Sequence, residues 1–179
     1  DPACDLAVCI ALASASTNRP MAGDVIAIGE VALSGDIRKV PFLSHEPERG
    51  DIVVFRHPRN GEDYIKRLIG LPGDKIQVTN GVLFINGAEV PQVAAGLFHE
   101  LYEPQGAMGD YPRCQNAPVG AGGDCTRERL TETLPNGVSH DILNIVNDGP
   151  GDDTPVFTVP EGQYFFMGDN RDNSTDSRF

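Results

Sequence analysis

The chain has 179 residues, of which 40% are hydrophobic and 22% charged, and its formal net charge at pH 7 is −12. This length and composition suit one core with room for a sizeable insertion. The negative charge excludes nucleic acid as the expected partner, because phosphates require a basic face. The sequence contains no run of roughly 18 apolar residues, the length that a complete transmembrane helix needs.

Residues 1–13 form an N-terminal segment with little pattern. The longest apolar stretch, Leu6 to Ala15, lies mostly within it. It is expected to be the remnant of a membrane anchor, a flank of one, or a buried N-terminal element. No charged region and cleavage site mark it as a signal peptide.

Short β-forming runs separated by turn residues predict a strand meander between residues 23 and 87, with little or no helix. Asn80-Gly81 between two apolar runs is a strong hairpin signal. Leu71-Pro72-Gly73-Asp74 has the residues of a type II turn, with Pro at the second position and Gly at the third. The expected strands are residues 25–28, 52–55, the apolar run around Lys66, 75–78 and 82–85.

Residues 88–155 differ in character, with more glycine, proline and acid. They are predicted to form an inserted, irregular β-rich subdomain. The core resumes with expected strands at 156–159 and 163–167. The sequence therefore predicts a discontinuous catalytic core made of residues 14–87 and 156–179.

The four cysteines fall into two pairs, Cys4 with Cys9 and Cys114 with Cys125. Neither pair has the C-x-x-C spacing of a zinc or redox motif. Cys114 and Cys125 flank a Pro/Gly-rich loop, and a disulfide closing that loop would restrict the unfolded chain. Such a bridge suits an oxidising compartment.

Lys66 lies inside an apolar run, next to a second cation, Arg67. Strand alternation places Tyr64, Lys66 and Leu68 on one face and Ile65, Arg67 and Ile69 on the other. One of the two cations is therefore expected to face the interior. A lysine in an apolar site has a lowered pKa and acts as a neutral base. The alternative is an exposed lysine that extends to water or pairs with Asp63.

The C-terminal stretch from Gly168 to Arg178 is polar throughout. It is compatible with a solvated loop or a series of Asx and Ser turns. An EF-hand-like calcium loop does not fit, because the acidic spacing is wrong and the loop glycine is missing. The sharper hypothesis is a hydrogen-bonding network beside a catalytic centre, in which Ser174 contacts a lysine amine and Asp176 pairs with Arg178.

Three motifs occur in a characteristic order, and together they are similar to those of bacterial type I signal peptidases (leader peptidases), the Ser/Lys endopeptidases of the secretory pathway. The resemblance covers residues 49–87 and 156–179 well, the middle loosely and the first 45 residues poorly. The motifs are Arg49-Gly50-Asp51-Ile52-Val53-Val54-Phe55, then Tyr64-Ile65-Lys66-Arg67 through Gly70-Leu71-Pro72-Gly73-Asp74, then Gly168 to Ser174 with Asp176-Ser177-Arg178.

The resemblance implies an all-β fold, a β-barrel or coiled-sheet catalytic core with an inserted subdomain. It makes Lys66 the general base and Ser174 the serine that orients it, with Asp176 and Arg178 as a structural pair behind. It also implies shallow apolar pockets for small residues at the first and third positions before the cleaved bond. The candidates for the pocket walls are Ile26, Val54 and Ile65.

The same resemblance implies removal of signal peptides from secretory precursors, with no cofactor and no metal. It implies contact with a membrane surface. The expected location is the bacterial inner membrane, with the catalytic domain on the periplasmic side.

The nucleophile motif departs from the family pattern, Ser-x-Ser-Met-x-Pro-Thr followed by Gly-Asp. Ser14-Ala15-Ser16 and Gly23-Asp24 are present, but Thr17 stands in place of Met and Pro20 comes one residue late. Ser16 is assigned as the nucleophile, with Ser14 completing the oxyanion hole. Ser14 as the nucleophile and an inactive site remain alternatives.

Three other functions are compatible with parts of the sequence. One is a self-cleaving, repressor-type Ser/Lys peptidase, although no Ala-Gly or Cys-Gly cleavage site precedes the serine. Another is a non-catalytic extracytoplasmic β-domain that binds peptides with a degenerate site. The third is a Ser-His-Asp triad, which is disfavoured because all four histidines are expected to be surface residues in turns or loops. They are His45, His57, His99 and His140.

Overall fold

The computed structural model describes residues 25–27, 30–31, 37–38, 47–56, 61, 63–105 and 109–179, the first three ranges as backbone only. Within this part the chain is all-β, which confirms the predicted fold class. It contains thirteen strands and one short 3-10 helix, η1 (Arg171–Asn173). The chain divides into two compact units, Asp1–Leu68 and Ile69–Phe179. Among the described residues, no helix is long and apolar enough to cross a bilayer.

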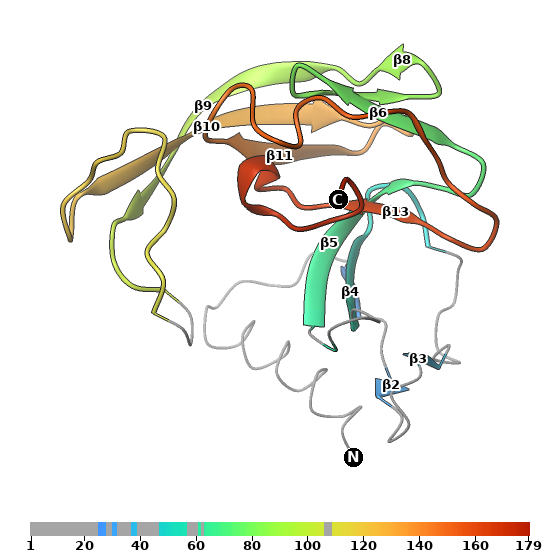
Figure 1. Cartoon of the computed structure of the whole chain (residues 1–179), viewed down its shortest axis with the longest axis horizontal. Coiled ribbons are helices and arrows are strands. Elements are labelled where there is room, and N and C mark those ends of the chain that lie inside the picture. Colours follow the sequence, from blue (N-terminus) through green and yellow to red (C-terminus); the bar gives the residue numbers. More distant parts are fainter. Residues whose placement is uncertain are drawn as a thin grey trace. The chain divides into compact units, whose positions relative to one another are not determined.

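Unit 1 is built on β1 (Val25–Ala27), β4 (Ile52–Arg56) and the part of β5 (Asp63–Gly70) that ends at Leu68. β1 pairs with β4 in parallel, and β4 pairs with β5 in antiparallel orientation (Figure 1). Two short strands, β2 (Glu30–Val31) and β3 (Ile37–Arg38), form a separate antiparallel pair. The strands expected around residues 25, 52 and 66 are therefore present.

In unit 2, the antiparallel hairpins follow the turn residues that predict them. β6 (Lys75–Thr79) and β7 (Val82–Ile85) are joined by Asn80 and Gly81, with φ of 49° and 75°. Two positive φ values in a two-residue loop are the geometry that Asn-Gly favours. Asn86-Gly87 repeats the geometry before β8 (Ala88–Glu89), and β12 (Phe157–Thr158) completes the order β12-β6-β7-β8.

The segment expected to be an irregular insertion contains the two longest strands of the described chain. β9 (Gln92–Leu101) and β10 (Asp124–Thr133) are ten residues each, and with β11 (Ser139–Asn144) they form a sheet in the order β11-β10-β9 (Figure 1). The segment is β-rich, as predicted, but more regular. Its strands are hard to detect because charged and polar residues dominate β10, so that few apolar positions mark the alternation.

The core of unit 2 lies between the β6–β7 hairpin and β13 (Phe165–Met167). Ile69 and Gly70, the last two residues of β5, belong to unit 2, and Ile69 is part of this core. A Cβ atom at Gly70 would lie 2.9 Å from side-chain atoms of both Ile76 and Phe165, so a side chain at residue 70 would overlap this core. Leu134, from the segment expected to be an insertion, contributes to the same cluster.

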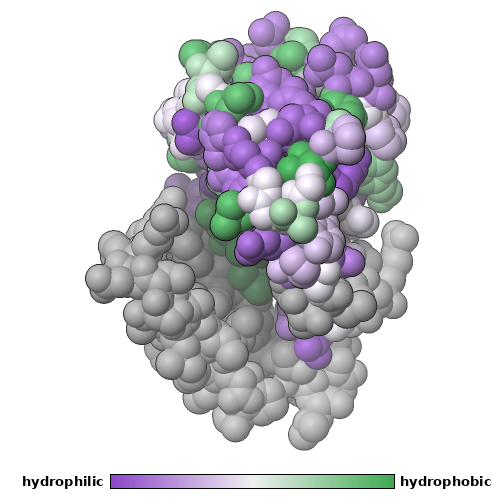
Figure 2. All heavy atoms as spheres, turned by 90° about the vertical axis from the view of Figure 1, so that its left-hand side faces the viewer, coloured by the Kyte–Doolittle hydropathy of each residue, from purple (hydrophilic) through white to green (hydrophobic). Residues whose placement is uncertain are grey.

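The described surface seen in Figure 2 is mainly hydrophilic, with separate apolar spots between the polar residues. This agrees with the large negative charge of the chain. Three large apolar side chains on β9 are nevertheless exposed: Val93 by 67%, Leu97 by 49% and Leu101 by 59%.

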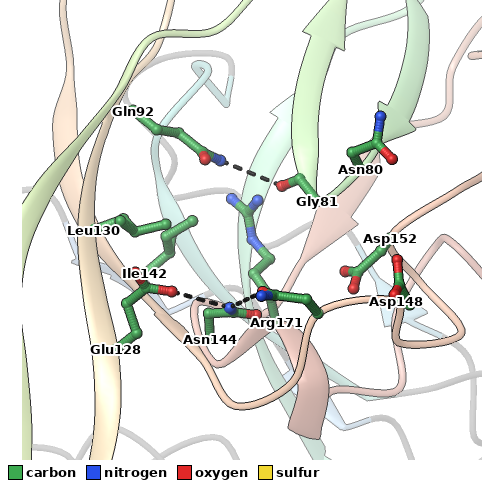
Figure 3. A pocket seen from close by; sticks show the side chains of 11 residues that line it. Asn80, Gly81, Gln92, Glu128, Leu130, Ile142, Asn144, Asp148, Asp152 and Arg171 are labelled. Atoms are coloured by element: carbon green, nitrogen blue, oxygen red, sulfur yellow. Dashed lines mark hydrogen bonds between the residues drawn. The ribbon is translucent and has the colours of Figure 1, made fainter.

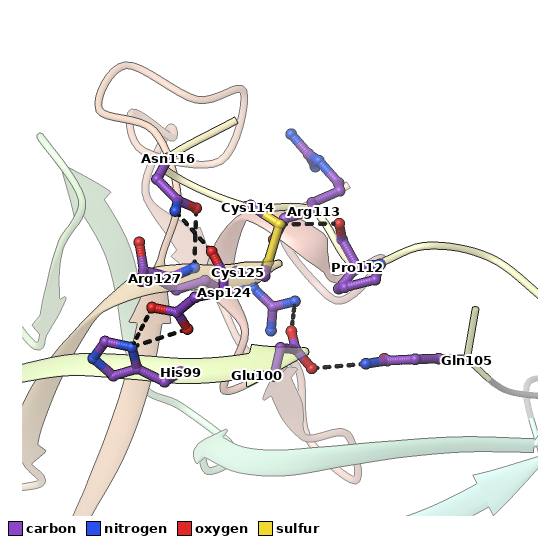
Figure 4. The surroundings of a disulfide bond; sticks show 11 residues. His99, Glu100, Gln105, Pro112, Arg113, Cys114, Asn116, Asp124, Cys125 and Arg127 are labelled. Atoms are coloured by element: carbon purple, nitrogen blue, oxygen red, sulfur yellow. Dashed lines mark hydrogen bonds and ion pairs between the residues drawn. A yellow bond between two sulfur atoms is a disulfide. The ribbon is translucent and has the colours of Figure 1, made fainter. Parts of the chain in front are cut away.

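A disulfide joins Cys114 to Cys125 at the start of β10, as the sequence suggests (Figure 4). Cys125 is fully buried. Asn116 supports the bridge, because its side chain donates to the Asp124 carbonyl over 2.9 Å and accepts from the Thr126 N–H over 3.0 Å. Cys4 and Cys9 lie outside the described residues.

Removing this disulfide will destabilise the chain. In the unfolded state, the bridge restricts the chain between Cys114 and Cys125, which are 11 residues apart. Replacing both cysteines with alanine restores the conformational freedom of this segment. This entropy corresponds to a loss of roughly 3 kcal/mol in the free energy of unfolding. Urea titrations of both proteins measure it, and wild-type protein with a reductant should behave like the double variant. Equal midpoints for wild type and variant would show that the bridge contributes nothing.

Candidate functional site

Lys66 lies on β5 directly opposite Val53 of β4, so the two side chains share a face of the sheet. The lysine is half-buried, and its Nζ lies 5.0 Å from the ring centroid of Tyr64, two residues earlier on the same strand. Of the two adjacent cations, Arg67 is the buried one, exposed by 8%. Its Nη1 donates to the Gly50 carbonyl over 2.7 Å.

Two of the candidate pocket residues, Val54 and Ile65, form the cross-strand pair next to that of Val53 and Lys66. Val54 pairs with Ile65 across β4 and β5, so these two side chains share the face opposite Lys66. Ile65 is 62% exposed, whereas Val54 is 9% exposed. The backbone of Ile26, on β1, is in register with Val53.

In unit 2, the expected pair between Asp176 and Arg178 is present and buried. Arg178 Nε donates to Asp176 Oδ1 and Nη2 to Oδ2, each over 2.9 Å, and the side chains are 1% and 0% exposed. Burial raises the pKa of Asp176, but the hydrogen bonds and charge of Arg178 outweigh it and hold the pKa below its usual value. The pair follows η1 in a turn and does not lie on a strand.

Ser174 packs against Gly168, the first residue of the same motif. A Cβ atom at Gly168 would overlap the Cβ and Oγ atoms of Ser174. The Ser174 Oγ is buried, and no hydrogen-bond partner with good geometry exists for it among the described residues. It is close enough to Asp176 to help lower the pKa of that carboxyl group, but it is not aligned for a hydrogen bond.

A second buried ion pair anchors the same motif. Glu132 of β10 is 0% exposed, and its carboxylate accepts from Arg171 Nη2 over 2.5 Å and from Nη1 over 3.2 Å. Gln92 also donates to it, over 3.1 Å, and His140 Nε2 lies 3.3 Å away. Burial opposes ionisation, but the Arg171 charge and these contacts outweigh it and lower the pKa of Glu132 from 4.5 to about 2.

A pocket of about 360 Å³ lies within unit 2, with Arg171 on its wall (Figure 3). The Arg171 side chain extends toward Gln92 and Gly81, which are joined by a hydrogen bond of 3.4 Å. Burial and the nearby charge of Asp172 raise the pKa of Asp152 on the same wall, although the Gly149 N–H opposes the shift. The other lining residues are Asn80, Glu128, Leu130, Ile142, Asn144, Asn147 and Asp148. In the described part of the chain, no cluster of three or more His, Cys, Asp or Glu side chains is suited to hold a metal.

The structure places some predicted site residues and not others. Ser174, Asp176 and Arg178 come together in unit 2, whereas Lys66 with Val54 and Ile65 belongs to unit 1. Ser14, Ser16 and the side chain of Ile26 lie outside the described residues.

The prediction that every histidine is a surface residue in a turn or loop is wrong for His140. This residue lies on β11 and is only 8% exposed, because the buried Glu132 carboxylate accommodates its ring. His99 lies on β9, not in a loop, but it is exposed and contacts Asp124 over 2.9 Å. His45 and His57 lie outside the described residues.

Glu132 and its partner Arg171 were missed as functional candidates. The sequence did contain a signal: alternation places Glu132 on the same side of the chain as Leu130 and as Leu134, the residue that follows β10. A buried carboxylate needs a cationic partner. Nothing in the sequence, however, indicated that the partner lies 39 residues away.

Replacing Gly168 with alanine will displace Ser174. The added methyl group overlaps the serine side chain, and such overpacking lowers the free energy of unfolding by about 1–3 kcal/mol. Urea denaturation gives the loss, and the serine displacement is visible in a crystal structure of the variant. Gly120→Ala is the control, since a Cβ there has no neighbour within 4 Å. Equal stability of both variants and an unmoved Ser174 would contradict the close packing.

Glu132 will make the stability depend on pH in the acidic range. Because its pKa is about 2 in the folded chain and 4.5 unfolded, its stabilisation is complete above pH 4.5 and is lost as the pH falls toward 2. This contribution is roughly 3 kcal/mol. Denaturation midpoints between pH 7 and pH 2.5 should converge for wild type and Glu132→Gln. The exposed Glu89→Gln control should follow wild type, and a constant offset for Glu132→Gln would refute the shift.

Comparisons with known proteins agree with the motifs. The family model described as signal peptidase, peptidase S26, matches residues 7–179. Signal peptidase I of Rickettsia typhi is 42% identical over 143 residues, and that of Rickettsia prowazekii 44% over 143 residues. Each alignment covers 76% of this chain and 46% of the relative, so the chain spans about half the length of these curated relatives.

A solved structure of a signal peptidase I from Enterococcus faecalis V583 is 29% identical, with a TM-score of 0.36, covering 75% of this chain and 86% of that one. The resemblance noted from the motifs is confirmed by the family match over nearly the whole chain. The chain belongs to the signal peptidase family, peptidase S26.

Proposed function

We propose that this chain is the catalytic part of a serine endopeptidase that removes N-terminal signal peptides from secreted precursor proteins. The observation that carries the proposal is the family match over residues 7–179, a range that contains every candidate site residue. The proteins it resembles in sequence are themselves named signal peptidase I.

Each candidate residue has one role in this proposal. Ser16 is the nucleophile, and Lys66 is the general base. Ser14 completes the oxyanion hole, and Ser174 orients the lysine amine. The buried pair of Asp176 and Arg178 supports the segment that carries Ser174, as its bidentate geometry suggests.

The reaction follows the general scheme of acyl transfer. The Ser16 hydroxyl attacks the peptide carbonyl while neutral Lys66 takes its proton, and Lys66 then protonates the leaving amine. Lys66 next activates a water molecule that hydrolyses the acyl-enzyme. The backbone N–H of Ser16 and the Ser14 hydroxyl stabilise the oxyanion, a contribution of about 3 kcal/mol in comparable sites.

The substrate binds as an extended strand beside β1. Among the described strands, β1 is the outermost in its sheet, so an added strand can pair with it. Such pairing places alternate side chains on one face, which suits small residues at the first and third positions before the cleaved bond. Ile26, Val54 and Ile65 are the proposed walls of the two pockets.

The proposed setting is the periplasmic side of the bacterial inner membrane, where precursors present their signal peptides. Contact with a membrane surface is proposed from the family match alone. The proposed division into a core (residues 14–87 and 156–179) and an inserted subdomain (88–155) remains a prediction.

The second candidate is a non-catalytic peptide-binding β-domain with a degenerate site. The irregular spacing between Ser16 and Gly23 favours it, since Pro20 comes one residue late and the segment from Pro20 to Gly23 is two residues shorter than the family pattern. A serine-reactive acylating inhibitor separates the two functions. A stoichiometric adduct at Ser16 supports the peptidase, whereas a peptide that binds without any adduct supports the binding domain.

Replacing Lys66 with alanine will abolish cleavage of a precursor peptide, because no other group is proposed to deprotonate the serine. The expected loss is at least about 10³-fold in kcat. Turnover is measured with a fluorogenic peptide carrying a small-x-small cleavage site. Lys75→Ala is the matched control, because Lys75 is an exposed lysine on β6, and it should retain full activity. Activity retained in Lys66→Ala would remove this lysine from the mechanism.

A further inference from the structure

The inserted residues hold the segment that carries Ser174 at several points within unit 2. The Leu143 N–H donates to the Asp169 carbonyl over 2.8 Å. The Asp172 carboxylate accepts from the Ile145 N–H over 2.6 Å, and Arg113 Nη1 donates to the Asp172 carbonyl over 2.6 Å. The motif therefore depends on strands β10 and β11 and the loops beside them for its conformation.

The Glu132–Arg171 pair is the buried, ionic member of this set of contacts. Both side chains are more than nine-tenths buried, and the guanidinium meets the carboxylate with two nitrogens. A bidentate pair of this kind restrains direction as well as distance. Arg171 is therefore held in one orientation at the start of η1, three residues before Ser174.

Arg178 links Arg171 to the rest of the segment by hydrogen bonds. Its Nη2 donates to the Arg171 carbonyl over 2.7 Å and to Asp176 Oδ2 over 2.9 Å. Asp176 Oδ2 in turn accepts from the Gly168 N–H over 3.0 Å, beside the Ser174 side chain. Ser174 thus lies between Arg171 and Asp176, and both of these residues accept hydrogen bonds from the Arg178 guanidinium.

We propose that Glu132, acting through Arg171, is a positioning residue for Ser174. The inference rests on the proposed function, in which Ser174 orients the base Lys66. It assigns residues 88–155 a part in the reaction, through the position of Ser174.

Stability and positioning can be separated at this site. Removing one partner of a buried ion pair is destabilising, because the other charge is left without compensation. Replacing both partners with apolar residues of similar size is often neutral for stability. The pair Glu132→Leu with Arg171→Met therefore removes the directional contact while it preserves the packing.

The experiment compares this double variant with wild type and with Asp141→Asn. The control lies on β11 of the same sheet, where Asp141 is exposed and contacts Thr131 and Arg129. We expect the double variant to melt within about 4 °C of wild type. Its kcat for a precursor peptide should fall by about 10- to 100-fold with little change in KM, because a small displacement of a positioning group has this effect.

Amide hydrogen exchange of the peptide that covers residues 168–178 gives a measurement independent of turnover. Exchange there should be at least about tenfold faster in the double variant, with the β6–β7 hairpin unchanged. Arg171→Lys, which keeps the charge but loses the bidentate contact, should give an intermediate exchange rate and kcat.

The outcomes distinguish this inference from the proposed function. Wild-type kcat in the double variant, or unchanged exchange at 168–178, overturns the positioning role whether or not the chain is a peptidase. Faster exchange at 168–178 supports the anchoring even if Lys66→Ala retains activity and the proposed mechanism fails. A fall in kcat accompanied by faster exchange, at unchanged melting temperature, supports both.

Discussion

The conformation of the C-terminal motif depends on the buried guanidinium of Arg178. It satisfies the Asp176 carboxylate with two hydrogen bonds and the Arg171 carbonyl with a third. Charged groups that leave water lose solvation, and only fixed partners with good geometry compensate for this loss. A polar stretch that would otherwise be a solvated loop is therefore ordered, because its charges are buried together.

The second buried pair, Glu132 with Arg171, applies the same principle to sheet β11-β10-β9. Glu132 reaches Arg171 from β10, and the low pKa of its carboxyl group, about 2, expresses how strongly the site favours the ionised form. The two pairs meet at residue 171, whose side chain contacts one and whose carbonyl contacts the other. Sheet β11-β10-β9 and the signal-peptidase motif are consequently joined inside unit 2 by a pair of residues, Glu132 and Arg171, that lie 39 residues apart in the chain.

Local chemistry explains which elements were predicted well. The hairpins at Asn80-Gly81 and the turn at Pro72-Gly73 follow from backbone preferences of two or three residues, and the turn closes with the Asp74 N–H bound to the Leu71 carbonyl over 3.0 Å. The sequence did not predict β9 and β10 as individual strands. They are stabilised by pairing with each other and carry few apolar residues in alternation. The same limit explains His140, whose burial depends on a carboxylate from a neighbouring strand.

The sequence alone determined the fold class, the short hairpins, the family motifs and the partnership of Asp176 with Arg178, because these depend on neighbouring residues or on a residue order that is legible by itself. Only the tertiary structure decided that Arg67 and not Lys66 is the more buried of two adjacent cations, and that Glu132 is the counter-ion of Arg171. Burial and long-range ion pairing depend on which strands meet in space, and that information is distributed over the whole chain. Alternation predicts which side a side chain takes, but only packing determines whether that side faces water.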